Sequence, residues 1–495
     1  MANIENDNKK RIMSGIIYMA LSLLLVCFFS KITPLIIYNA DDWWYMGTIR
    51  LPFPQWAGWN PSRIFPEVAM PLLTGRFAAY IIYPITGDYV FSVTLATAIV
   101  MTILIVFMCL CMQRVLVRKY NCSKLLSMIY TGIFLVSFFL MFRNRSGSKY
   151  LFYSADLCTA YFYTMSGIIN AILTLSLFSE ENATDSFKRM KLYKKVLFCL
   201  FIYFAMFSNL FHSAITAVYC GTVILFDLIK ERSLHKSLKK NLLQVSIVLV
   251  WFIVLAFEYS GGRSDSFEQG IDLALSFRQF MTMIGAMSIA YKIIVLLSVI
   301  GFIWLLRMKK DVGILPMIIV SGILETAFLL LLNAKVHYMS RVEASWGTWF
   351  YLILFCVTVF VYVCKSVGAE LDNNIGDDLR DKVFWGSLLT LLIMIVFSWY
   401  PDGKFAISST RNPDYDQCYD TSSYIFNSIV DADRAGQTEM VLKLPKSDRA
   451  DEFTFVPQIG NTVSNSLYLQ GIISHKINVM EEFDESLNER FLPKE

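Results

Sequence analysis

Charged side chains are scarce in this chain of 495 residues: Asp, Glu, Lys and Arg make up 17% of it, whereas hydrophobic residues make up 56%. The mean hydropathy is +0.50. This composition excludes a soluble globular protein and is typical of a chain that crosses a lipid bilayer several times. The net charge is only +4, so the charge balance gives no indication of a nucleic-acid partner.

Motifs for metal and nucleotide binding are also missing. The ten cysteines include no Cys-x-x-Cys spacing, and most lie in apolar runs, where a thiol acts as a small hydrophobic group. The segments predicted to face the cytoplasm contain no Gly-rich phosphate loop with its lysine. No small-residue cleavage signal follows the first apolar run, so we expect an uncleaved span with its basic start in the cytoplasm.

Apolar runs of about 20 residues predict the architecture. We expect an all-α polytopic membrane protein, with residues 1–400 forming the membrane domain. Basic clusters such as Arg114, Arg118 and Lys119 then lie on the inner side, as the positive-inside rule requires. The eleven predicted spans are 12–29, 89–112, 125–142, 157–178, 196–211, 212–229, 241–257, 281–306, 312–332, 345–364 and 383–400.

Two segments depart from this pattern. Segment 64–84 is apolar, but its prolines, Glu67 and Arg76 favour helices that lie along the outer membrane surface over a further crossing. Residues 401–495 lack long apolar runs and predict a small extracytoplasmic α/β unit, with a helix over 424–434 and a strand over 440–444. This unit either helps to cover a site and meet an acceptor, or is a passive cap.

The adjacent acids Asp41 and Asp42 follow the first span and are bracketed by Tyr38, Trp43 and Trp44. Aromatic residues of this kind sit at headgroup level, so we expect both carboxylates at the outer membrane surface. One interpretation is a solvated turn that caps a membrane helix. The other is a functional pair that takes a proton, holds a divalent metal such as Mg²⁺ or Mn²⁺, or does one of each.

Further polar side chains of the predicted outer side join the acid pair as candidate site residues. The guanidinium of arginine suits phosphate, and a phosphate at a membrane surface is the headgroup of a lipid carrier. Arg76 has an alternative use in snorkelling, His212 in hydrogen bonding at a helix end, and Glu258 in pairing with its neighbouring arginine. The candidates are Arg63, Arg76, Lys149, His212, Glu258, Arg263, His337 and Arg341.

A span followed at once by Asp41-Asp42, a long outer loop with interfacial helices, the step Gly75-Arg76 and an outward Arg341 together resemble GT-C fold membrane glycosyltransferases. The chain looks most like the bacterial Gtr-type enzymes of this fold, which add sugars from polyprenyl-phosphate donors to surface glycans. The resemblance covers residues 12 to 400. Gly261-Gly262-Arg263 and the segment from His337 to Arg341 are similar to loop motifs of these enzymes.

This resemblance implies an inverting transfer of a sugar from a polyprenyl-phosphate donor to a surface glycan or a teichoic-acid-like acceptor. The reaction would take place at the outer face of a bacterial plasma membrane, with the N-terminus cytoplasmic and the C-terminus extracytoplasmic. Asp41 or Asp42 would act as the base. Arg76, Arg263 and Arg341, with His337 nearby, would bind the phosphate that leaves.

The resemblance also implies partners, namely a small flippase and a polyprenyl-phosphate sugar synthase. Two other classes of protein remain as alternatives. A transporter or flippase of lipid-linked substrates predicts ionisable residues at membrane depth, for which Lys292 and Glu325 are the candidates. A non-catalytic subunit of glycan assembly predicts that Asp41 and Asp42 tolerate substitution.

Overall fold

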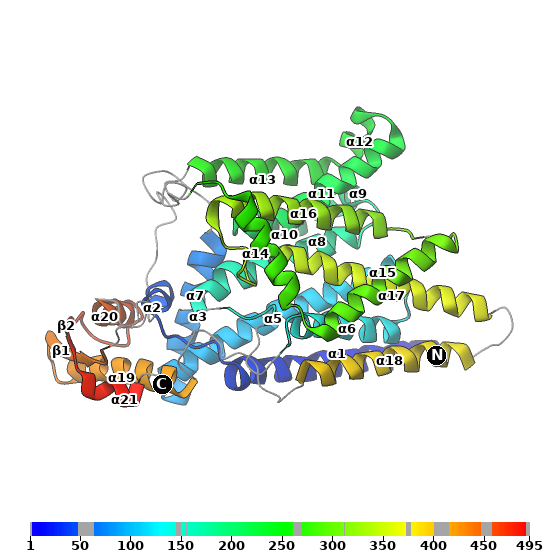
Figure 1. Ribbon diagram of the computed structural model, residues 1–495. Helices are drawn as coiled ribbons and strands as arrows, with labels where there is room; N and C mark the ends of the chain where they lie inside the picture. The colour runs from blue at the N-terminus through cyan, green and yellow to red at the C-terminus, as the bar shows by residue number, and fades with distance from the viewer. Residues whose placement is uncertain are drawn as a thin grey trace.

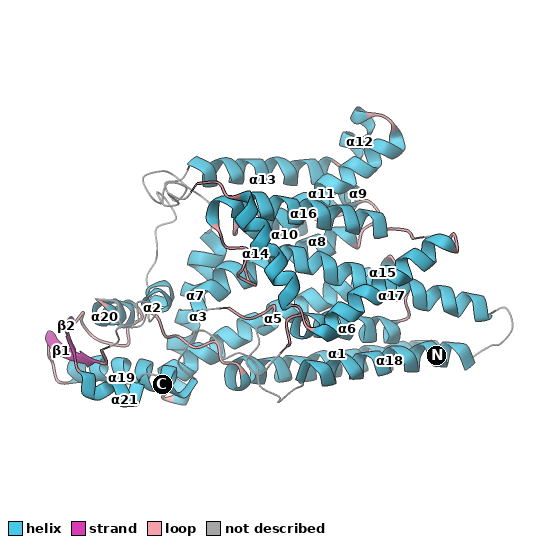
Figure 2. Ribbon diagram, viewed as in Figure 1, coloured by secondary structure: helices cyan, strands magenta, loops and turns pink. Residues whose placement is uncertain are grey.

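The computed structural model describes residues 2–47, 64–144, 150–154, 156–260, 270–310, 312–372, 378–399, 415–446 and 458–491. These residues are mostly helical, with one small sheet (Figure 2). Among them, nine helical segments are long and apolar enough to cross a membrane: Ile12–Ile32, Tyr89–Arg118, Leu157–Phe178, Leu210–Glu231, Leu242–Tyr259, Ile289–Arg307, Leu315–Val336, Trp346–Val367 and Asp381–Trp399. The chain is therefore a multi-pass membrane protein.

Each of these nine segments overlaps one of the eleven predicted spans. The other two predicted spans, 125–142 and 196–211, correspond to the shorter helices α6 (Lys124–Leu140) and α10 (Leu192–Met206). Helices of 17 and 15 residues reach about 25 and 22 Å, which is less than the usual hydrocarbon thickness. The count of eleven crossings therefore stays a prediction.

The long helices lie side by side along roughly one direction (Figure 1). Their outward faces expose apolar side chains, among them Leu23 (67% exposed), Phe252 (54%) and Val396 (64%). Apolar surface of this extent is stable in lipid rather than in water. The helices are α1 (Ala2–Cys27), α5 (Tyr89–Arg118), α8 (Ser166–Phe178), α11 (Leu210–Glu231), α13 (Leu242–Ser260), α15 (Ile289–Arg307), α16 (Leu315–Val336), α17 (Trp346–Asp372) and α18 (Asp378–Trp399).

The two ends of the bundle differ. The N-terminus and the short helix α12 (Leu234–Lys240) lie at one end, near α9 (Ala183–Arg189), as Figure 1 shows. Helix α2 (Ala40–Gly47) and all elements after residue 415 lie at the opposite end, which we call the α2 end. The two termini of the described chain thus lie at opposite ends of the bundle.

Helices with π-type hydrogen bonding gather near the α2 end. Segment 64–86 follows one irregular helical path through η2 (Ile64–Ala69), α3 (Met70–Phe77), η3 (Ala78–Ile82) and α4 (Tyr83–Thr86). Prolines within it lack the backbone N–H that a regular α-helix needs. This path is not among the nine candidate spans of the described chain. Two more π segments are η1 (Phe28–Ile32) and η4 (Ala160–Met165), and such turns are frequent at functional sites.

Helix α14 (Leu273–Ala286) runs across its neighbours rather than along them (Figure 1). The backbone N–H of Asp272, at its start, donates to Ala334 O at 2.8 Å. Just after its end, the N–H of Ser288 donates to Met141 O at 2.8 Å. The predicted span over 281–306 therefore starts too early, because the helix breaks at Met287 and a new helix, α15, begins with Ser288 as its N-cap.

The C-terminal elements form a small α/β unit. They are α19 (Tyr415–Arg434), β1 (Glu439–Leu444), α20 (Ile459–Leu469), β2 (Asn478–Phe483), a 3₁₀ turn η6 (Glu485–Leu487) and α21 (Asn488–Phe491). Strands β1 and β2 pair in parallel, with Leu442 opposite Glu481. The helix predicted over 424–434 and the strand predicted over 440–444 are confirmed.

Helix α20 packs directly on α2. The hydroxyl of Ser466 donates to Trp43 O at 2.7 Å, and Gln470 Nε2 donates to Met46 O at 2.9 Å. Gln470 Oε1 also accepts a hydrogen bond from the Tyr89 hydroxyl at 2.6 Å. A Cβ at Gly47 would lie 2.2 Å from Ser466 Cβ, so only glycine permits this close approach. The C-terminal unit thus holds the helix that carries the acid pair.

Candidate functional site

Asp41 and Asp42 lie in the first turn of α2 but point into different surroundings. Asp42 is 1% exposed. Its Oδ2 accepts hydrogen bonds from the N–H of Tyr38 (3.0 Å) and of Asn39 (3.1 Å), and its Oδ1 accepts one from Cys158 N–H (2.8 Å). Asp41 is exposed, and its side chain makes no hydrogen bond or ion pair with another described residue. The hydrogen bonds of Asp42 therefore anchor the start of α2, whereas the carboxylate of Asp41 is exposed.

Asp156 brings a second, half-buried carboxyl group close to Asp42. It is the N-cap of α7 (Leu157–Thr159), where its Oδ1 accepts hydrogen bonds from the Thr159 N–H at 2.5 Å and from the Thr159 hydroxyl. Burial raises the pKa of Asp42, and repulsion from Asp156 raises it further, against the effect of the three backbone N–H donors. Burial also raises the pKa of Asp156. Both carboxyl groups therefore bind a proton more tightly than an exposed aspartate does.

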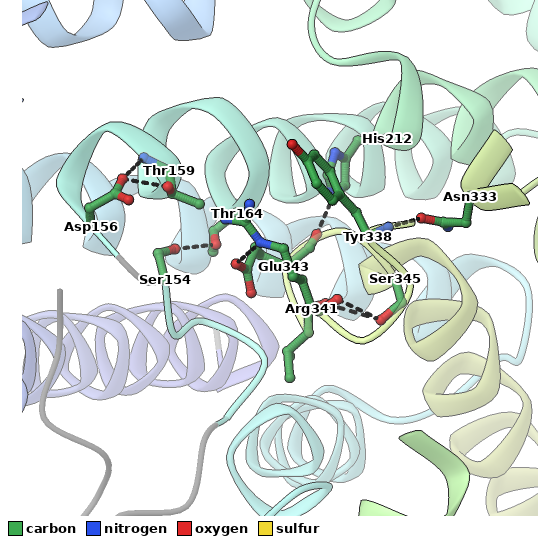
Figure 3. A network of polar contacts seen from close by, with 11 residues as sticks. Ser154, Asp156, Thr159, Thr164, His212, Asn333, Tyr338, Arg341, Glu343 and Ser345 are labelled. Carbon is green, nitrogen blue, oxygen red and sulfur yellow. Dashed lines mark hydrogen bonds and ion pairs between the residues drawn. The ribbon is translucent and has the colours of Figure 1, made fainter. Parts of the chain in front are cut away.

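Arg341 occupies the loop between α16 and α17, and Figure 3 shows it beside Glu343. Its Nε donates to Glu343 Oε1 at 2.8 Å. The centre of its guanidinium group lies 5.3 Å from the ring centre of Tyr163 and 5.3 Å from that of Tyr338. Burial lowers the pKa of Arg341, but the attraction of Glu343 and other acids outweighs burial and raises it overall, so this side chain stays charged.

Only the Nε group of the Arg341 guanidinium has a hydrogen-bond partner among the described residues. Its side chain is 33% exposed, whereas that of Glu343 is 2% exposed. Both Nη groups of Arg341 donate to no described residue, although Asp156 is near enough to act on its pKa. Two aromatic rings and one carboxylate thus fix a guanidinium whose outer N–H groups are available to an anion.

Three helices fix the loop that carries Arg341. From α11, His212 Nε2 lies 2.8 Å from the backbone oxygen of Glu343. From α16, Asn333 Oδ1 accepts from the N–H of Tyr338 at 3.0 Å. From α17, Trp349 Nε1 donates to Ser345 Oγ at 2.8 Å, and this hydroxyl in turn donates to Arg341 O at 3.1 Å. These hydrogen bonds therefore fix the backbone of the loop at Arg341.

The other candidate residues do not join this cluster. Arg76 Nη1 donates to the Tyr80 hydroxyl at 2.5 Å on the exposed face of its own helical segment. His337 ends α16 with a left-handed backbone (φ 57°), and its Nε2 lies 3.1 Å from Ala334 O. Glu258 lies in the last turn of α13. The remaining candidates fall outside the described residues: Arg63, Lys149 and Arg263.

Asp156 and Glu343 are not among the site residues that the sequence predicted. Two local signals favoured them: Asp156 precedes a helix as an N-cap, and Glu343 stands two positions after Arg341. No comparable signal marks Tyr163. Its contact with Arg341 depends on the π-helical segment η4.

A metal at Asp41 and Asp42 does not fit the geometry. Both carboxylate oxygens of Asp42 already accept backbone N–H groups. Within the described ranges, no three His, Cys, Asp or Glu side chains lie close enough together to hold a metal ion. No step below depends on a metal.

Comparison with known proteins gives no match for this chain among protein-family models, curated proteins or solved structures.

Proposed function

We propose that this protein is a membrane glycosyltransferase. It moves a sugar from a polyprenyl-phosphate donor to a surface glycan or cell-wall polymer at the outer face of a bacterial plasma membrane, with inversion at the anomeric carbon. The observation that carries this proposal is Arg341, whose side chain is 33% exposed, whose Nη groups donate to no described residue, and which lies near the half-buried carboxyl group of Asp156. We assign the α2 end of the bundle to the outer side.

Arg341 suits the leaving group of such a reaction. When the bond between the anomeric carbon and the phosphate oxygen breaks, negative charge develops on the phosphate that stays with the lipid. A guanidinium held by Glu343 and by two tyrosine rings can donate to that charge without reorganising. Its neighbours Asp156 and Glu343 keep the pocket from binding anions indiscriminately, because they offset its charge.

Asp41 suits the role of base. The acceptor hydroxyl must lose its proton as its oxygen attacks the anomeric carbon. Asp41 is the exposed member of the acid pair, whereas the oxygens of Asp42 are engaged with backbone N–H groups. In this mechanism Asp41 takes the proton, the phosphate leaves with the lipid, and Asp42 fixes the position of α2.

The test uses the purified full-length protein in vesicles with a panel of short-chain polyprenyl-phosphate hexoses and pentoses, and measures the polyprenyl phosphate that is released. We expect Arg341→Gln to lower kcat/KM by about a hundredfold, as loss of a charge-stabilising donor does in other enzymes. Arg434→Gln is the matched control, because Arg434 is an exposed arginine of α19. Transfer by Arg341→Gln at the wild-type rate, or no release from any donor, would overturn the proposal.

A transporter of lipid-linked substrates is the second candidate, and Glu325 is the observation that favours it. This residue is fully buried in α16, and neither carboxylate oxygen has a hydrogen-bond partner among the described residues. It does not pair with Lys292, whose Nζ donates to Gly285 O at 2.7 Å. Movement of a fluorescent polyprenyl phosphate across vesicle membranes that Glu325→Gln abolishes would support this function, and unchanged movement would exclude it.

A further inference from the structure

An apolar groove opens among α14, α15, α16 and α17. It has a volume of about 710 Å³. Phe280 of α14 lies at one side of it and Ala327 of α16 at another. The groove follows α16 from Ile318 to Leu330, a distance of about 18 Å at the rise of an α-helix. It lies within the membrane-spanning helices, so its natural contents are hydrocarbon.

One end of this groove reaches the loop of Arg341. Trp349 and Thr348 line it, and both belong to the first turn of α17. Trp349 also donates to Ser345, which bonds to the backbone of Arg341. Helix α14 crosses its neighbours (Figure 1), and its residues Phe280 and Ile284 line the groove.

Lys292 gives the groove a charge. Among the described residues that line the groove, Lys292 is the one with a charged side chain. It lies in the first turn of α15. Its Nζ donates to Gly285 O, which leaves two N–H groups of the ammonium for another acceptor. An apolar groove with an ammonium group in its lining is complementary to an amphiphile with an anionic head and a hydrocarbon chain.

We infer that this groove binds the hydrocarbon chain of the lipid donor, with the phosphate directed to the loop of Arg341. This inference rests on the function proposed above. A single polyprenyl chain with a small anionic head fits one apolar groove with one ammonium group beside it better than a two-chain phospholipid does. Lys292 then attracts the phosphate, and Trp349 marks the point at which chain and headgroup meet.

The experiment places the full-length protein in phosphatidylethanolamine vesicles with a polyprenyl phosphate that carries a diazirine in its chain. After irradiation, we expect adducts on peptides that contain groove residues such as Ile323 and Phe355. Unlabelled polyprenyl phosphate should compete, and phosphatidylglycerol should not. Ala327→Trp, which fills the groove, should lower labelling at least tenfold. Leu331→Trp is the matched control, because Leu331 is 63% exposed on α16 and does not line the groove.

The outcomes separate this inference from the proposed function. Labelling that maps to the groove and is lost in Ala327→Trp supports the groove even if no sugar donor is ever turned over. Equal competition by phosphatidylglycerol, adducts outside the groove, or equal labelling of Ala327→Trp and Leu331→Trp would overturn it, whatever the transfer assay gives. Where transfer is measured, Ala327→Trp should raise KM for the donor at least tenfold and leave kcat nearly unchanged.

Discussion

His212 Nε2 lies 2.8 Å from the backbone oxygen of Glu343, so a buried ring of the bundle holds the loop that carries Arg341. Because a carbonyl can only accept, Nε2 carries the proton and Nδ1 is an acceptor. Nδ1 has no hydrogen-bond partner among the described residues. His212, one of the candidates chosen from the sequence, therefore acts here through the backbone of this loop.

Replacing His212 by Phe tests this contact. An aromatic ring is kept, although a slightly larger one, but the hydrogen bond to the loop is lost and the Glu343 carbonyl remains buried without it. We expect the free energy of unfolding to fall by about 1–3 kcal/mol. The midpoint of thermal unfolding in detergent measures the change, with His235→Phe on the exposed helix α12 as the control. Equal midpoints for the two variants would contradict the role assigned to His212.

Two substitutions at Glu343 separate geometry from charge. A glutamine at this position can still accept from Arg341 Nε, so Glu343→Gln should keep the guanidinium in place while raising the net charge around it. Glu343→Ala should release the guanidinium from that position. In donor-binding measurements, we expect Glu343→Ala to weaken binding of polyprenyl phosphate at least tenfold. Glu343→Gln should bind within about threefold of the wild type; weaker binding by the glutamine variant than by the alanine variant would refute the positioning role.

Asp41 and Asp42 should respond differently to the same substitution. Asp41→Asn removes the proposed base from an exposed position, so we expect transfer to be abolished and thermal stability to be unchanged. Asp42→Asn replaces one acceptor oxygen by an NH₂ group that faces backbone N–H donors, at an expected cost of about 1–3 kcal/mol. Transfer assays and unfolding midpoints measure both effects. Wild-type transfer by Asp41→Asn would refute the mechanism.

The carboxyl groups of Asp42 and Asp156 also predict a dependence of stability on pH. The pKa values of Asp42 and Asp156 are raised in the folded state, so the folded protein binds protons more tightly than the unfolded chain. Their contribution is most favourable below the ordinary carboxyl pKa of about 4 and is lost as pH rises towards the raised values. We expect Asp156→Asn to flatten the decline in unfolding midpoint above pH 4. An unchanged pH profile would contradict the coupling of the two acids.

Hydropathy predicted the long helices because a membrane span must satisfy its own backbone and keep an apolar surface, and both demands are local. It failed at 281–306 for a local reason as well. The residues of α14 that fall in this range are as apolar as those of α15, and the break between them depends on one capping serine, Ser288. The direction of α14 depends on tertiary hydrogen bonds of Asp272 and Ser288. The hydropathy pattern of the sequence does not predict such bonds.

The candidate site was predictable only in part. Sequence reasoning identified Asp42 and Arg341, because acids and arginines near span ends are uncommon and costly. It did not show that Asp42 would be buried, since one of its three hydrogen-bond donors is the backbone N–H of Cys158, a group that any residue but proline supplies. Sequence reasoning also did not predict that Asp156 lies near Arg341. These residues are far apart in the chain and come together only when the helices pack.

Because Ser466 and Gln470 hydrogen-bond to α2, the position of this helix depends on residues that are synthesised late. Helix α2 leaves the ribosome before the rest of the bundle, yet the residues that hydrogen-bond to it are made after the long apolar helix α18. A nascent chain halted at α18 would carry Asp41 on a helix without these contacts. The final position of α2 is thereby deferred until synthesis has passed Gln470.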